Sequence, residues 1–196
     1  YTDGEIGWRK KAGKVAALDA EIEARPLKDS VLGIGHTRWA THGGPTDLNA
    51  HPHVVDGGKL AVVHNGIIDN AASVRAQLQA DGVEVSSDTD TEVLAHLIAR
   101  SDATTLEAAV LETLGRVTGT YALAVIDEQH PERVVVARSG SPLIIGVGEK
   151  EMFVASDVAA LVRHTNRVVH LEDGELATVT AQGFRTFDRA SNATDR

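Results

Sequence analysis

Short apolar runs, rich in β-branched residues and bounded by turn residues, recur along most of the chain. Runs of this length and composition predict buried β-strands. In the second half they follow one another at short intervals, with Glu149-Lys150 and Asp173-Gly174 as turns, which predicts antiparallel hairpins rather than βαβ crossovers. The expected strands cover residues 31–36, 60–64, 121–127, 133–137, 143–147, 152–155, 168–171 and 175–180.

Apolar residues at helical spacing are concentrated in the middle of the chain. Gly82 stands where the first helix should stop, and Thr89 or Thr91 can cap the second. Helices are expected at residues 69–80, from the Thr89 region through 98, at 105–117, and in a short stretch capped by Ser156. Helices in the middle with hairpin strands around them predict an α+β fold in which helices cover the sheet layers.

The composition fits one domain that spans all 196 residues, 42% of them hydrophobic. A net charge of -9 argues against nucleic acid or an anionic membrane as the main partner. No apolar run approaches the roughly 20 residues of a membrane helix, and residues 1–14 have no apolar centre of a signal peptide. A soluble, cytoplasmic protein is therefore expected. The sequence contains no cysteine, which excludes disulfides and a cysteine nucleophile within these residues.

The segment 33–43, GIGHTRWATHG, carries the first candidate chemistry. Arg38 offers a planar fork of donors suited to a carboxylate, and Gly43-Gly44-Pro45 is suited to a loop over a ligand. The alternative is structural: Arg38 would pair with an acidic side chain, and Trp39 would fill the core.

A buried strand then runs into Asn65-Gly66. A side-chain amide followed by an unhindered backbone N–H can stabilise an oxyanion in acyl transfer. The alternative is a tight turn, for which Asn-Gly is the commonest dipeptide.

Histidines and carboxylates form two further candidate groups. His51 and His53, with His42, Asp88 and Asp90, are residue types that bind divalent metals, but the intervening proline and the ligand spacing favour structural or ligand-contacting imidazoles. The carboxylates between residues 86 and 92 precede a helix, where they can cap it or hold an ammonium group. A guanidinium, a carboxylate and an oxyanion hole together suit glutamine undergoing hydrolysis of its side-chain amide.

Four motifs in this order, HTRWATHG, NAHPH, VVHNGII and SDTDTE, resemble the class II glutamine amidotransferases with an N-terminal nucleophile, and most closely the glucosamine-6-phosphate synthases. The later segments RSGSPLIIGVG and EMFVASDVAAL extend the resemblance over nearly the whole chain. It implies a four-layer αββα sandwich of two antiparallel sheets between helices. The implied glutamine-binding residues are Arg38 for the α-carboxylate, Asp90 for the α-ammonium, Trp39, Thr41 and His42 in a loop that closes on the ligand, and His51 without a defined role. Asn65 and Gly66 would form the oxyanion hole, and no metal or cofactor is implied.

The sequence departs from this family at its beginning. The family's nucleophile is an N-terminal cysteine whose own amine acts as the base, and nothing before Tyr1 supplies it. We therefore expect an upstream segment to be missing and the chain alone to be inactive. The family's C-terminal sugar isomerase part, which binds fructose 6-phosphate, is also not present in the sequence, and the full-length protein is expected to form a homo-oligomer.

Three alternatives stay open. One is another class II amidotransferase, feeding phosphoribosylamine or glutamate synthesis. Another is a domain that binds glutamine without catalysis. The third is a metal hydrolase built on the histidines.

Overall fold

The computed structural model describes residues 5–39 and 43–195. Its helices are α1 (Val15–Ala24), α2 (Ala71–Ala80), α3 (Asp90–Ala99), α4 (Leu106–Arg116) and the short 3-10 turns η1 (Asp56–Gly58) and η2 (Val158–Ala160). The strands are β1 (His53–Val55), β2 (Leu60–Ile68), β3 (Gly119–Asp127), β4 (Arg133–Ser139), β5 (Ile144–Val147), β6 (Met152–Ala155), β7 (Val168–His170), β8 (Leu176–Thr180), β9 (Gly183–Phe187) and β10 (Ala193–Thr194). None of these helices is long and apolar enough to cross a membrane.

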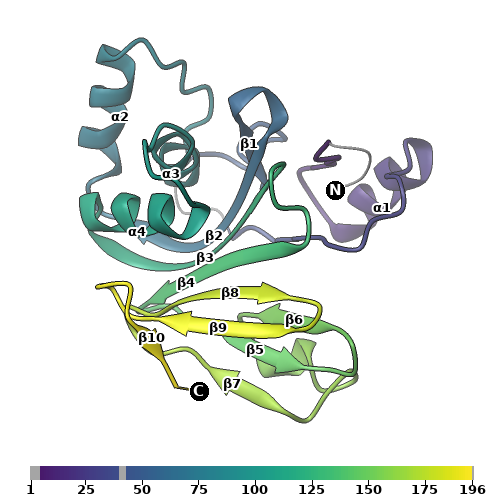
Figure 1. Ribbon diagram of the computed structural model, residues 1–196. Helices are drawn as coiled ribbons and strands as arrows, with labels where there is room; N and C mark the ends of the chain where they lie inside the picture. Colours follow the sequence, from purple (N-terminus) through teal and green to yellow (C-terminus); the bar gives the residue numbers. More distant parts are fainter. Residues whose placement is uncertain (1–4, 40–42, 196) are drawn as a thin grey trace.

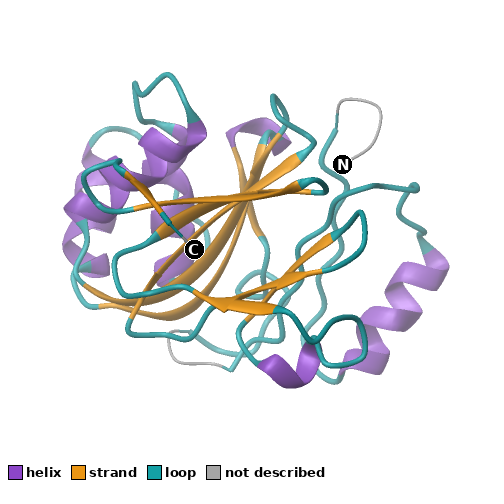
Figure 2. Ribbon diagram, turned by 60° about the horizontal axis from the view of Figure 1, so that its bottom comes forward, coloured by secondary structure: helices purple, strands orange, loops and turns teal. Residues whose placement is uncertain are grey.

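The strands form two antiparallel sheets. Seven lie in the order β1-β2-β3-β4-β8-β9-β10, and a smaller sheet has the order β6-β5-β7. Helices α2, α3 and α4 cover one face of the larger sheet, and the smaller sheet lies on the other side (Figures 1 and 2). Helix α1 lies apart from them, near the N-terminus. The predicted α+β sandwich of two antiparallel sheets is confirmed, with α2, α3 and α4 outside the larger sheet.

Strand alternation explains why the larger sheet is apolar on both faces. In β3, Leu123 and Val125 belong to the core shared with the helices, whereas Ala122 and Ala124 belong to the core between the two sheets. Successive side chains of a strand point to opposite faces, so a strand covered on both sides becomes a continuous apolar run. This is the pattern from which the strand was predicted.

Most predicted elements are confirmed, with ends shifted by a few residues. Thr89 caps α3, where its hydroxyl accepts from the N–H of Glu92. The helix expected after Ser156 is only the 3-10 turn η2, and its cap is Asp157, whose carboxylate accepts from the N–H of Ala159. Five of the described elements were not predicted: α1, β1, η1, β9 and β10.

The strand predicted at residues 31–36 is wrong as a hydrogen-bonded strand. Leu32, Ile34 and His36 are half-buried, and the residues between them are exposed, so the side chains do alternate as in an extended chain. No strand among the described residues pairs with this segment. Leu32 and Ile34 pack instead against the small cluster of Ile6, Ala61 and Ile126.

Candidate functional site

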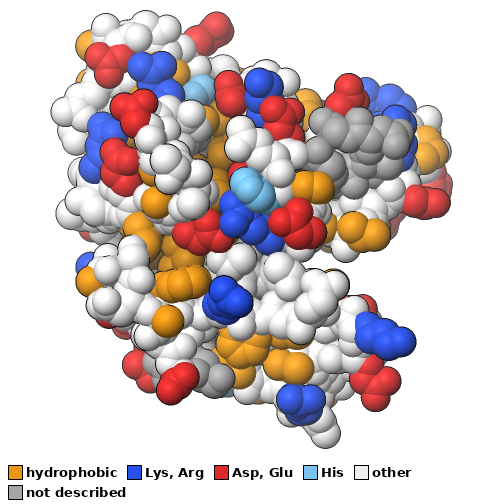
Figure 3. All heavy atoms as spheres, viewed as in Figure 1, with side chains coloured by type: hydrophobic (Ala, Val, Ile, Leu, Met, Phe, Trp, Pro, Cys, Tyr) orange, Lys and Arg blue, Asp and Glu red, His pale blue; other side chains and the backbone are white. Residues whose placement is uncertain are grey.

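The centre of the candidate site is Asn65 and Gly66, in the middle of strand β2. They lie opposite Ala122 and Tyr121 of β3, so the interpretation of Asn-Gly as a turn is wrong. The Asn65 side chain is exposed and lines a cavity of about 200 Å³. Residues 33–36, parts of β3 and β6, and Ser156 line the same cavity. The face in Figure 3 is hollowed between the larger part of the molecule and the small sheet.

Gly66 occupies a position that no other residue fits. Its φ is +145°, and a Cβ there would lie 2.1 Å from the carbonyl oxygen of Thr120 and 3.0 Å from Nε2 of His64. Only glycine tolerates this φ without strain. The absence of a side chain at Gly66 therefore allows the backbone of β2 to lie this close to that of β3.

Asp90 belongs to helix α3 and contacts the last residue of strand β2. It is the first residue of α3, is 5% exposed, and its Oδ2 accepts from the N–H of Ile68 at 2.9 Å. Ile68 is two residues beyond Gly66, so the carboxylate expected to hold an ammonium group is tied to the strand that carries the candidate oxyanion hole.

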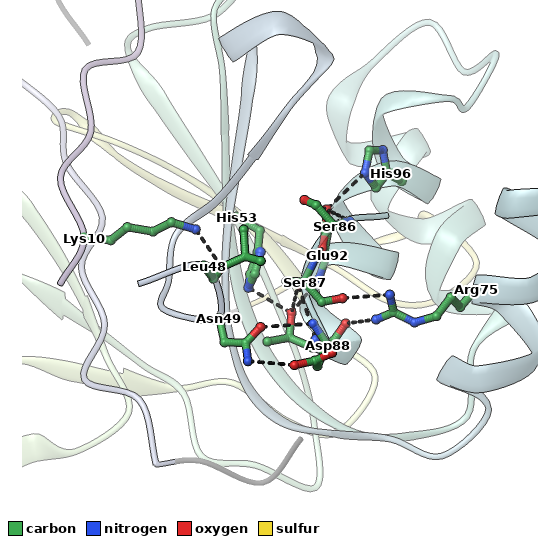
Figure 4. Close-up of polar contacts among 11 residues, drawn as sticks. Lys10, Leu48, Asn49, His53, Arg75, Ser86, Ser87, Asp88, Glu92 and His96 are labelled. Atoms are coloured by element: carbon green, nitrogen blue, oxygen red, sulfur yellow. Dashed lines mark hydrogen bonds and ion pairs between the residues drawn. The ribbon is translucent and has the colours of Figure 1, made fainter. Parts of the chain in front are cut away.

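The turn before Asp90 is fixed from two helices (Figure 4). Arg75 of α2 donates to the carbonyl oxygens of Ser87 and Thr89, both at 2.7 Å. The carboxylate of Glu92 accepts from the N–H groups of Ser86 at 2.9 Å and Ser87 at 2.5 Å. Burial alone would raise the pKa of Glu92, but hydrogen bonds from His96, Ser87 and Ser86 outweigh it and hold that pKa well below its usual value. The turn is thus held in one geometry by an ionised acid and a guanidinium.

The Asn49 side chain joins this turn to the segment that follows the motif HTRWATHG. Its Nδ2 donates to Oδ2 of Asp88 and to the carbonyl oxygen of Gly44, both at 3.1 Å, and its Oδ1 accepts from the N–H of Asp88 at 3.0 Å. Gly43 packs directly on this pair, since a Cβ there would lie 2.5 Å from Nδ2 of Asn49.

Arg38 contacts the same segment. Its Nη1 donates to the carbonyl oxygen of Gly44 at 3.1 Å, and its Nη2 donates to that of Gly43 at 3.3 Å. Trp39 is 91% exposed, so the interpretation that it fills the core is wrong. Thr41 and His42 lie outside the described residues.

Four histidines lie behind the site. The rings of His36 and His51 stack with centroids 4.1 Å apart, and Nδ1 of His51 accepts from the N–H of His64 at 3.3 Å. His64 pairs with the hydroxyl of Thr91 at 3.1 Å, and Nε2 of His53 lies 2.9 Å from the hydroxyl of Thr89.

These histidines are neutral around pH 7. Burial lowers the pKa of His36 and of His53 to about 4, and burial also lowers the pKa of His51 and of His64. The nearby charge of Arg38 lowers the pKa of His36, His51 and His53 further. His51 therefore supports β2 as an uncharged ring, whereas His53 and His64 contact Thr89 and Thr91 at the start of α3. Within residues 5–39 and 43–195, no three His, Asp or Glu side chains are grouped so that they could hold a metal ion.

The structure thus groups Asn65, Gly66, Asp90 and His51 around strand β2. Arg38 contacts Gly43 and Gly44, and the Asn49 side chain connects this segment to the turn before Asp90. Asn49 and His64 lie within the motifs NAHPH and VVHNGII, but the sequence alone predicted no role for either residue. Arg75 was missed because nothing in its helical surroundings distinguishes it from a solvent-exposed arginine.

Comparison with known proteins agrees with this arrangement. A family model described as a glutamine amidotransferase domain matches residues 23–193. The chain is 54% identical over 192 residues to a glutamine–fructose-6-phosphate aminotransferase (isomerizing) of Corynebacterium efficiens, a match that covers 96% of the chain and 31% of that protein. The protein of the same name from Streptomyces coelicolor is 49% identical, with 93% of the chain and 30% of that protein covered. The chain therefore spans about 30% of the length of the curated relatives that it matches.

Solved structures give the same fold. A glutamine phosphoribosylpyrophosphate amidotransferase from B. subtilis, complexed with ADP and GMP, matches with a TM-score of 0.68 and 30% identity, over 81% of this chain and 35% of that one. A structure described as the allosteric regulatory enzyme of purine biosynthesis matches with a TM-score of 0.69 and 32% identity, over 80% and 35% of the two chains.

Proposed function

Since the chain belongs to the glutamine amidotransferase domain family, we propose that it binds L-glutamine and forms the glutaminase site of a longer enzyme. The observation that carries this proposal is the position of Asn65 at the cavity. The next residue, Gly66, has a backbone conformation and a close neighbour that only glycine tolerates. The Asn65 amide and the Gly66 N–H are the donors proposed for the oxyanion. The Asp90 carboxylate holds the α-ammonium group, and Arg38 holds the α-carboxylate.

The nucleophile in this proposal is a cysteine at the mature N-terminus of the full-length protein. The extended segment 33–36 and strand β6 line the same cavity as Asn65, and this cavity is where we place the cysteine. The thiolate attacks the side-chain carbonyl carbon of glutamine, and the donors of β2 stabilise the negative charge on oxygen. Ammonia then leaves with a proton from the cysteine's own amine, and water releases glutamate from the thioester.

For the whole protein, we propose that the ammonia goes to fructose 6-phosphate bound by a C-terminal sugar isomerase part, giving glucosamine 6-phosphate in a cytoplasmic homo-oligomer. The names of the relatives at 54% and 49% identity support this choice. The alternative is an amidotransferase that makes phosphoribosylamine, as the structural neighbours' names suggest, but these are only 30% and 32% identical to the chain.

The test uses the full-length protein from its natural gene, with Asp90→Ala and Asn65→Ala compared in glutamate release from glutamine. Asp90→Ala should raise KM for glutamine, because it removes a ground-state contact. Asn65→Ala should lower kcat by about 10²–10³, because it removes a donor needed in the transition state. Equal losses in binding for both variants would refute these roles. A wild-type protein that binds glutamine and releases no glutamate would favour a non-catalytic binding domain.

A further inference from the structure

The Asn49 side chain lies at the junction of three segments that are far apart in the sequence. It is 1% exposed, and its amide uses both its donor and its acceptor group there. A buried amide that is fully hydrogen-bonded fixes its neighbours strongly, since losing a partner leaves unsatisfied polar groups. Figure 4 shows it between Leu48 and Asp88, beside the turn that leads into α3.

One acceptor is shared between Asn49 and Arg38. The carbonyl oxygen of Gly44 accepts from Nδ2 of Asn49 and from Nη1 of Arg38, both at 3.1 Å. Gly44 therefore links the Asn49 amide directly to the guanidinium of Arg38. On its other side, Asn49 makes two hydrogen bonds to Asp88, which precedes Asp90 by two residues.

The junction is packed as well as hydrogen-bonded. A Cβ on Gly43 would lie 2.6 Å from Cβ of Asp88, so the two segments are in direct contact. Asn49 itself is held by Thr46, whose hydroxyl accepts from the N–H of Asn49 at 3.2 Å. From the opposite side, Lys10 donates to the carbonyl oxygen of Leu48 at 3.0 Å. The amide therefore cannot shift without moving both segments.

We propose that Asn49 is a positioning residue for glutamine: it sets the spacing between Arg38 and Asp90. This inference rests on the proposed function, in which these two residues bind the two charged groups on the α-carbon. A carboxylate and an ammonium on one carbon atom leave little tolerance in their separation. Fixing the two protein groups in advance lowers the entropic cost of binding the amino acid.

A purely local role, in which Asn49 only stabilises its own turn, makes a different prediction. Asn49→Ala would then lower the free energy of unfolding and leave glutamine binding unchanged. Asn70 offers a matched control, because its amide also joins two segments: Nδ2 donates to the carbonyl oxygen of Arg116 and Oδ1 accepts from the N–H of Thr118, both at 3.0 Å. None of these residues belongs to the proposed glutamine site.

The experiment measures KM and kcat for glutamate release by the full-length natural protein and its variants. Asn49→Ala should raise KM for glutamine about tenfold, with kcat changed by less than about threefold. Asn70→Ala should leave both constants at the wild-type values. Asp88→Ala should reproduce the effect of Asn49→Ala, and Asp88→Asn, which keeps an acceptor oxygen for Nδ2 of Asn49, should retain a KM close to wild type. Asp88 is exposed, so its variants keep the test informative if Asn49→Ala fails to fold.

A second readout separates positioning from general damage to the site. Iodoacetamide alkylates a reactive cysteine but has neither an α-carboxylate nor an α-ammonium, whereas 6-diazo-5-oxo-L-norleucine has both. Asn49→Ala should slow inactivation by the norleucine reagent about tenfold and leave the iodoacetamide rate unchanged. Equal slowing with both reagents, or an unchanged KM, would overturn the positioning role while the wild type remains active. A full-length wild type that releases no glutamate would instead overturn the proposed function, and this inference with it.

Discussion

Replacing Gly66 by alanine tests the geometry of the candidate oxyanion hole. The new Cβ would lie 2.1 Å from the carbonyl oxygen and 2.7 Å from the carbonyl carbon of Thr120, whereas carbon atoms at ordinary contact are about 3.5–4.0 Å apart. Both atoms belong to the backbone of β3, so no side-chain rotation relieves the clash. Strand β2 must move away from β3 by more than about 1 Å, and the Asn65 amide moves with it.

The expected loss of stability has two parts. A non-glycine residue at a φ of +145° costs about 1–3 kcal/mol, and overpacking against an unyielding neighbour costs about 1–3 kcal/mol more. The free energy of unfolding should therefore fall by about 2–6 kcal/mol, a large part of the 5–15 kcal/mol typical of a domain.

Gly183 provides the matched control. Its φ is +155°, and nothing lies within 4 Å of a Cβ built on it. Gly183→Ala should therefore show only the backbone strain, about 1–3 kcal/mol. Both variants are measured by denaturant unfolding with the m-value checked for constancy, and by glutamate release from the full-length protein. Equal destabilisation of the two variants, with glutaminase activity kept in Gly66→Ala, would show that β2 is not held this close to Thr120.

Three further results are expected. The free energy of unfolding should fall by about 1–4 kcal/mol as the pH is lowered from about 7 to 5. The pKa of His36 and of His53 is about 4 in the folded protein and 6.5 in the unfolded chain, so the unfolded chain binds more protons in this range. A stability that does not change with pH would contradict this prediction. Arg75→Met should lower the free energy of unfolding by about 1–3 kcal/mol through loss of its two carbonyl contacts, while Arg100→Met, on an exposed residue, should change it by less than about 0.5 kcal/mol. Trp39→Ala should leave the free energy of unfolding within about 0.5 kcal/mol of wild type, because the ring is exposed, yet raise KM for glutamine; a large stability loss would show that the ring packs in solution.

Local patterns were sufficient to predict most helices and strands. Helix α3 has a threonine cap and a continuous buried face, and β3 has apolar residues on both faces, so each carries its signal within its own residues. Helix α1 has no buried residue and therefore gave a weak signal. The segment 31–36 shows the limit of such patterns, because extended side-chain alternation becomes a strand only when a neighbour supplies the hydrogen bonds.

The site was predictable as a set of motifs but not as a set of contacts. Asn65, Gly66 and Asp90 were found because their residue types match one ligand. The contact between Asn49 and Asp88 joins positions 39 residues apart, and nothing local in either segment indicates the other. The close approach of Gly66 to Thr120 likewise depends on the register of β2 against β3, which the sequence alone does not determine.

The proposed function places the glutaminase site of a longer enzyme in this domain and its nucleophile on an N-terminal cysteine. The most direct measurement is intact mass spectrometry of the full-length natural protein, rapidly quenched in acid after mixing with L-glutamine, with the modified residue located by fragmentation. We expect a mass increase of one γ-glutamyl group on an N-terminal cysteine, with much less adduct in Asn65→Ala. A folded, full-length protein whose N-terminal residue is not a cysteine, or which forms no adduct and releases no glutamate, would contradict it.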